Sequence, residues 1–77
     1  MNNKTTKITL SKIKNLGCNI AIQRKKLKYS QNQFAEILNI SREHLAKIET
    51  AKRSVSLDLL ISIADNLNVK VRDLINF

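Results

Sequence analysis

The stretch that decides the fold runs from Ser30 to Arg53 and reads SQNQFAEILNISREHLAKIETAKR. It contains two short amphipathic segments, which are separated by a break at residues 39–41. In the first segment, the apolar residues that share one helical face are Phe34, Ala35, Ile37 and Leu38. In the second, Leu45 and Ile48 share a face at i, i+3 spacing. Neither segment can bury its apolar face alone, so the rest of the chain must supply a core.

Both segments begin with residues that commonly start helices. Ser30 or Gln31 precedes the first and Ser41 precedes the second, and such side chains accept hydrogen bonds from the free N–H groups of a first turn. Two helices of about eight residues joined by about three have the geometry of a helix-turn-helix.

Length and composition favour one small, all-helical domain. The 77 residues include one glycine and no proline, which suits helices with tight connections. The single cysteine, Cys18, excludes an internal disulfide and fits a reduced, cytoplasmic setting. The longest apolar run, residues 57–64, is too short and too interrupted to span a membrane, and no signal peptide is evident.

The net charge of +8 is distributed unevenly. Residues 1–28 carry eight lysines and arginines and no acid, whereas the remainder is close to neutral. This asymmetry indicates a polyanionic partner such as nucleic acid. The alternative is a solvated basic tail.

The segments outside the central pair complete the expected domain. Residues 1–10 are polar and are predicted to form a flexible basic N-terminal arm, with a short strand at 6–10 as an option, and residues 11–77 form the domain. A first helix is expected at about residues 12–27, with the apolar stripe Ile13, Leu16, Ile20 and Leu27 and a weak point at Gly17. Further helices are expected at residues 57–66 and 71–76, and the stripe expected on the former is Leu57, Leu60, Ile61, Ala64 and Leu67.

Arg24 lies in the middle of the first apolar stripe. A guanidinium that faces a core needs a partner, because an unpaired buried charge is very unfavourable. Glu49 follows Ile48, at the edge of the apolar face of the third helix. We therefore predict a partly buried structural ion pair between Arg24 and Glu49. The alternative is that Arg24 reaches solvent along its own aliphatic stem.

Residues 16–74 carry a family pattern, made up of Leu16-Gly17, Ile20, Arg24, Ser30-Gln31, Phe34-Ala35, Ile40-Ser41-Arg42, Leu45, Ile48-Glu49, Lys52-Arg53, Leu60, Ala64, Leu67 and Val69. This pattern resembles the Xre family of helix-turn-helix regulators, of the phage repressor and Cro/C1 type. The resemblance implies a compact five-helix, all-α DNA-binding domain that acts as a dimer on palindromic operators. It also implies the Arg24–Glu49 pair. The family often has glycine where this chain has Asn39 and Ala51; Asn39 tolerates a left-handed turn, whereas Ala51 alters the loop that follows.

The third helix is the expected recognition helix, which reads base edges from its exposed side. Its predicted base-reading residues are Arg42, Glu43 and Lys47, of which Arg42 and Lys47 suit guanine and Glu43 suits cytosine. The alternative for Glu43 is an i, i+4 pair with Lys47 on a solvated face. The residues expected at the DNA backbone are Gln31, Ser41, Thr50, Lys52 and Arg53. The resemblance also implies that Gln31 can brace the third helix, and the alternative for Gln31 is a plain capping role.

Surplus apolar residues near the end of the chain predict a dimer interface formed by Leu59, Ile63, Val71, Ile75 and Phe77. The alternative is that these residues close the core of the monomer. An enzyme is not expected, because phosphate loops, nucleophile motifs and clustered catalytic acids are absent from the sequence. The only histidine, His44, has no partner at ligand spacing, so neither a metal nor another cofactor is expected.

These observations predict a small, sequence-specific regulator of transcription, such as a repressor, that binds double-stranded DNA as a homodimer. It is similar to the controller proteins of restriction–modification systems. The alternative is an antitoxin or interaction module, which binds a partner protein and autoregulates its operon, because the same fold serves both roles.

Overall fold

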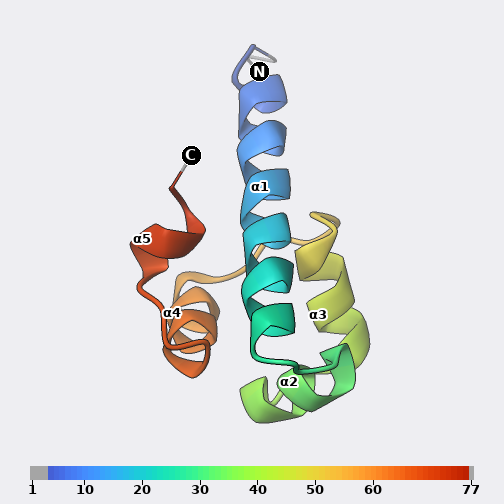
Figure 1. Cartoon of the computed structure of the whole chain (residues 1–77). Coiled ribbons are helices and arrows are strands. Elements are labelled where there is room, and N and C mark those ends of the chain that lie inside the picture. Colours follow the sequence, from blue (N-terminus) through green and yellow to red (C-terminus); the bar gives the residue numbers. More distant parts are fainter. Residues whose placement is uncertain (1–3, 77) are drawn as a thin grey trace.

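The computed structural model describes residues 4–76, and side-chain environments from Lys7 onward. Over this range the chain forms five helices and no strand: α1 (Lys4–Lys26), α2 (Gln31–Leu38), α3 (Arg42–Glu49), α4 (Leu57–Asn66) and α5 (Val71–Leu74). The predicted five-helix, all-α fold is therefore confirmed. Figure 1 shows the long α1 in the centre, α2 across its C-terminal end, α3 on one side, and α4 and α5 on the other. None of the described helices is both long and apolar enough to cross a bilayer.

All five helices contribute to one apolar core. Its buried side chains are Ile20, Phe34, Ala35, Leu38, Leu45, Ile48, Leu60, Ile63, Ala64, Leu67 and Leu74. The Tyr29 ring stacks on Phe34 with 5.7 Å between ring centroids. Removal of these apolar surfaces from water is the main force that holds the short helices together.

The turn between α2 and α3 forms as predicted. Ser30 caps α2 in a reciprocal box, in which its hydroxyl oxygen accepts from the Gln33 N–H at 3.0 Å and its own N–H donates to the Gln33 side chain at 2.8 Å. Asn39 ends α2 at φ 59°, in the left-handed region that asparagine tolerates. The Ser41 hydroxyl oxygen then accepts from the His44 N–H at 3.0 Å and caps α3.

The first helix is longer than predicted. It begins at Lys4, so residues 4–10 are helical and the short strand considered for residues 6–10 is wrong. The side chains of residues 7–10 are all exposed. No face of this segment packs on the core, so the helical spacing of apolar residues that revealed the other helices is missing here. Residues 1–3 of the predicted arm lie outside the described range.

Several apolar residues that were assigned to the core lie at the surface. The stripe of α4 that faces inward is Leu60, Ile63, Ala64 and Leu67. Leu57 is 70% exposed and Ile61 is 45% exposed, and Leu27 and Ile37 are also exposed. Because α4 is apolar on most of its circumference, its sequence did not determine which side would face the core.

The predicted dimer interface needs a correction at Ile63. This side chain is 0% exposed within the monomer, so it belongs to the core and offers no surface to a second copy. Leu59 and Val71 are half-buried against the core, whereas Ile75 is exposed. The helix α5 ends at Leu74, two residues earlier than predicted. Phe77 lies outside the described residues.

Ala51, the second residue after α3, has φ 61°. A Cβ makes this left-handed conformation unfavourable by about 1–2 kcal/mol, whereas glycine adopts it freely. We expect Ala51→Gly to raise the free energy of unfolding by about 1 kcal/mol, because the relief exceeds the added entropy of the unfolded chain. Chemical denaturation measures the change. The control, Ala46→Gly inside α3, should lower the same quantity by about 1 kcal/mol. A loss of stability in both variants would contradict the left-handed conformation assigned to Ala51.

Candidate nucleic-acid interface

The predicted Arg24–Glu49 ion pair is present and joins α1 to α3. Arg24 Nε donates to Glu49 Oε2 at 2.7 Å, and Arg24 Nη2 donates to Glu49 Oε1 at 3.0 Å. Both side chains are almost fully buried, at 7% and 5% exposure. Arg24 Nη1 donates to the Tyr29 carbonyl at 2.7 Å, which occupies the remaining side of the guanidinium. A bidentate pair with its other donors satisfied is the arrangement in which a buried charge pair is tolerated.

Gly17 allows the backbones of α1 and α3 to touch. A Cβ at this position would lie 2.6 Å from the Ile48 carbonyl oxygen and 2.7 Å from that of Glu49. Any side chain would therefore push the C-terminal end of α3 away from α1. An isolated glycine inside a helical pattern often marks such an approach. The sequence showed Gly17 only as a weak point in the helix.

Gln31 connects this buried pair to the surface. Its Nε2 donates to Glu49 Oε1 at 3.0 Å, and its Oε1 accepts from Arg42 Nη1 at 3.4 Å. A continuous polar chain thus runs from Arg24 through Glu49 and Gln31 to Arg42. This chain links the start of α2 to both ends of α3. Gln31 therefore does more than cap a helix.

The outer face of α3 carries the predicted base-reading residues. Arg42, Glu43 and Lys47 are all exposed, on the side away from the buried Leu45 and Ile48. The exposed side of α3 thus carries a guanidinium, a carboxylate and an ammonium group, and its opposite side packs on the core. These groups can form hydrogen bonds with base edges in a major groove.

Residues 20–74 match the helix-turn-helix family. The chain belongs to this family. The match covers α2 to α5 and the second part of α1, and it confirms the resemblance to Xre-like, DNA-binding transcription regulators.

Solved structures agree on the fold of this helix-turn-helix protein. The restriction-modification controller protein C.AhdI from Aeromonas hydrophila superimposes with a TM-score of 0.79 at 23% sequence identity. The match covers 83% of this chain and 97% of that chain. A search of curated proteins found no match.

The residues expected at the DNA backbone surround α3 in this helix-turn-helix protein. The Ser41 oxygen accepts a hydrogen bond from the backbone, so its own hydroxyl hydrogen is free to meet a phosphate. Thr50 Oγ1 instead donates to the Ala46 carbonyl at 2.8 Å and must rotate before it can donate to a phosphate. Lys52 and Arg53 are exposed in the loop that follows α3.

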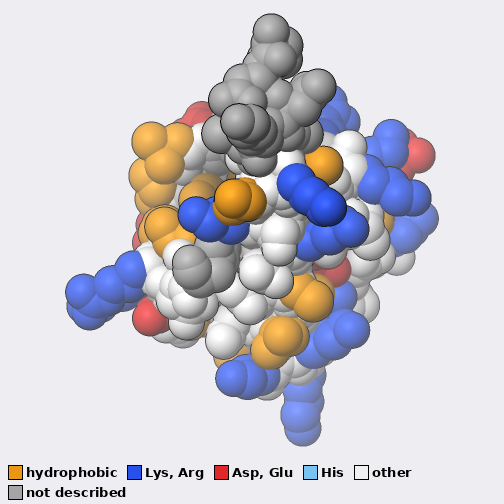
Figure 2. All heavy atoms as spheres, turned by 90° about the horizontal axis from the view of Figure 1, so that it is seen from above, with side chains coloured by type: hydrophobic (Ala, Val, Ile, Leu, Met, Phe, Trp, Pro, Cys, Tyr) orange, Lys and Arg blue, Asp and Glu red, His pale blue; other side chains and the backbone are white. Residues whose placement is uncertain are grey.

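Basic side chains gather on the α3 side of the helix-turn-helix protein. Figure 2, which looks down on the N-terminal end of α1, shows many lysine and arginine side chains on the right of the view, the side on which α3 lies in Figure 1. Hydrophobic side chains are prominent on the left, the side of α4 and α5.

The described residues contain no group of His, Cys, Asp and Glu placed to hold a metal ion, and His44 is half-buried on α3.

Proposed function

We propose that this transcription regulator reads a palindromic double-stranded operator as a homodimer. The observation that carries the proposal is the polar chain from Arg24 to Arg42, which holds α3 against the core while its outer side stays exposed. A recognition helix needs both properties, because base reading requires side chains held in a defined register.

Arg42 and Lys47 are suited to the O6 and N7 acceptors of guanine, and Glu43 is suited to the N4 donor of cytosine. Lys52, Arg53, Ser41, Thr50 and Gln31 would bind phosphates around them. Contacts with phosphates set the position of the protein on DNA without reading its sequence.

The Arg42→Ala variant is expected to relax the preference at one base pair in each half-site. The expected loss of discrimination there is roughly 1–3 kcal/mol, the value of one bidentate contact. A selection of binding sites from random duplexes measures the preference at every position.

Lys52→Ala is the matched control, because its side chain is predicted to bind phosphate. It should weaken all sequences about equally and leave the selected site unchanged. Identical selected sites for both variants and the wild type would show that Arg42 does not read bases.

Dimerisation is proposed because a single recognition helix contacts few base pairs, whereas two copies double the site at a spacing of about 34 Å. Among the described residues of the C-terminal third, the large apolar side chains that are exposed are Leu57, Ile61 and Ile75. With the half-buried Leu59 and Val71, they revise the interface predicted from the sequence. Residues 54–77 carry two basic and three acidic side chains, so two copies would meet there with little repulsion.

Ile61→Asp is expected to give a folded monomer, because the new charge would have to be desolvated in the interface. Operator binding should weaken in parallel. The matched control is Ile37→Asp on α2, where the side chain is 44% exposed against 45% for Ile61. Analytical sedimentation compares the oligomeric state of the two variants with that of the wild type. The protein concentration is on the order of tens of micromolar, which suits a dimer of moderate affinity. A monomeric wild type, with or without its selected duplex, would reject the dimer.

A further inference from the structure

The N-terminal half of α1 lies outside the region that the family shares. The family match begins at residue 20, whereas α1 begins at Lys4. Figure 1 shows the first turns of α1 projecting past the other helices.

The loop that follows α3 lies against the middle of α1. A small hollow at this contact is lined by Ile13, Leu16, Gly17, Ile48, Arg53, Ser54 and Val55. Lys14 lies between Ile13 and Leu16 in the sequence, at the level along α1 where this loop packs. Lys7 is seven residues earlier on the same helix, which is about 10 Å further along its axis.

The two lysines share one side of α1. Residues seven apart in a helix differ by about 20° in direction, so Lys7 and Lys14 point almost the same way. Lys14 also precedes Gly17, the contact with α3, by three residues and therefore lies on the neighbouring side of the helix. Both side chains are exposed.

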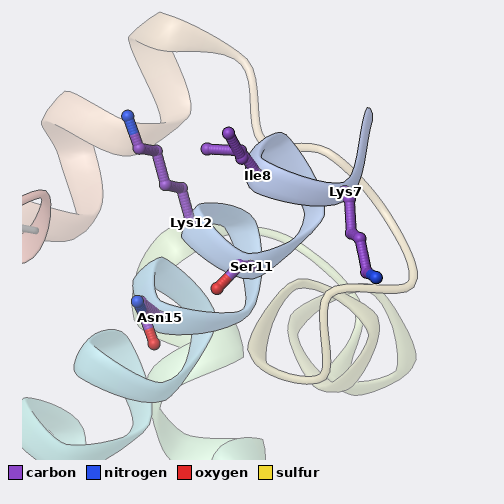
Figure 3. A pocket seen from close by; sticks show the side chains of 5 residues that line it. All are labelled: Lys7, Ile8, Ser11, Lys12 and Asn15. Carbon is purple, nitrogen blue, oxygen red and sulfur yellow. The ribbon is translucent and has the colours of Figure 1, made fainter. Parts of the chain in front are cut away.

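Lys12 lies on the α5 side of α1, so it can be compared with Lys7 and Lys14 as a lysine that faces away from α3. It precedes Asn19 by seven residues, and the Asn19 side-chain amide donates to the Leu74 carbonyl of α5 at 2.8 Å. Figure 3 shows the side chains of Lys7 and Lys12 leaving α1 in opposite directions. Only Lys7 is on the α3 side.

No acidic residue precedes Glu36 in the sequence, so α1 offers no internal partner to these lysines. Each DNA strand carries one phosphate for about every 3.4 Å of duplex axis, so a duplex offers several phosphates to two long side chains that leave α1 about 10 Å apart. Two exposed ammonium groups on the α3 side of α1 therefore match the charge of a DNA backbone.

We propose that Lys7 and Lys14 bind phosphates that flank the half-site, so that the N-terminal half of α1 extends the DNA contact beyond the helix-turn-helix. This inference rests on the proposed function, since it requires that α3 first places the protein on its duplex. The two lysines add affinity and read no bases.

The experiment compares the double variant Lys7→Gln/Lys14→Gln with Lys12→Gln/Lys70→Gln, which removes the same charge on the side of α5. Glutamine has nearly the helix propensity of lysine, and circular dichroism checks that each variant is folded. Binding is measured against salt on two labelled duplexes of the sequence that the wild type selects. The long duplex extends beyond the selected site by about ten base pairs on each side, which is one helical turn. The short duplex ends at the last selected base pair on each side.

On the long duplex, Lys7→Gln/Lys14→Gln should reduce the magnitude of the slope of log K against log salt by about 1.8 per bound subunit, from about 0.9 for each phosphate. On the short duplex it should match the wild type, because the flanking phosphates are absent. Lys7→Arg/Lys14→Arg should restore the slope on the long duplex. Equal slopes for the two glutamine variants on the long duplex would overturn the inference. A wild type with no salt dependence on either duplex would instead reject the proposed function.

Discussion

The Glu49→Ala variant should lose roughly 3–5 kcal/mol of its free energy of unfolding, the usual effect of removing one partner of a buried ion pair. The loss is large because Arg24 would keep its charge at a site where 7% of its side chain is exposed. Two of its hydrogen bonds go to the Glu49 carboxylate, and Gln31 also loses its acceptor there. Small domains have only about 5–15 kcal/mol in total, so a large part of the stability would be lost.

Thermal and urea denaturation measure the effect of Glu49→Ala. The matched control is Glu43→Ala, which removes an exposed carboxylate from the same helix and should change stability by at most about 0.5 kcal/mol. The double variant Arg24→Met/Glu49→Leu should recover much of the loss, because apolar residues of similar volume often replace buried pairs without penalty. If Glu49→Ala and Glu43→Ala had the same melting temperature, the Arg24–Glu49 ion pair would contribute nothing to the stability of the fold.

Gly17→Ala is expected to destabilise the protein by about 3 kcal/mol, at the upper end of the range for overpacked cores. The opposite result would follow from helix propensity alone, because alanine is favoured over glycine by about 1 kcal/mol inside a helix. The new Cβ would lie 2.6 and 2.7 Å from two backbone carbonyl oxygens of α3, which cannot move aside as a flexible side chain can. The sign of the change therefore distinguishes contact from propensity.

Cys18→Ala serves as the control for Gly17→Ala, because it changes the next position on α1, where the side chain is exposed. It should raise stability by a few tenths of a kcal/mol through helix propensity. Denaturation of both variants under reducing conditions makes the comparison. An increase in stability in Gly17→Ala similar to that in Cys18→Ala would mean that α1 and α3 are not in contact at this point.

Much of the fold could be predicted from the sequence, because α2 and α3 combine clear caps with narrow apolar stripes. Ser30, Ser41 and Asn39 each occupy the position that their side chains favour. The Arg24–Glu49 pair was predictable for a different reason: a charge inside an apolar stripe requires an opposite charge nearby.

Other parts depended on information that local patterns do not contain. The beginning of α1 was missed because residues 7–10 pack on nothing. The orientation of α4 was ambiguous, so Ile63 was assigned to the surface although it is completely buried. The family resemblance implied that Gln31 braces α3, but its partners could not be identified from local patterns, because Glu49 and Arg42 are 18 and 11 residues away along the chain.

The bridge made by Gln31 also bears on the entropy of the proposed DNA recognition. Arg42 is held by Gln31, and Gln31 is held by the buried carboxylate of Glu49, before any DNA is present. A long side chain that is already restricted loses less rotamer freedom when it meets a base, so less of the interaction energy is cancelled by ordering. If α3 reads bases as proposed, this contact partly orders one of its reading side chains in advance. Changes in operator preference would then come from exchanging side chains on a fixed helix rather than from refolding the interface.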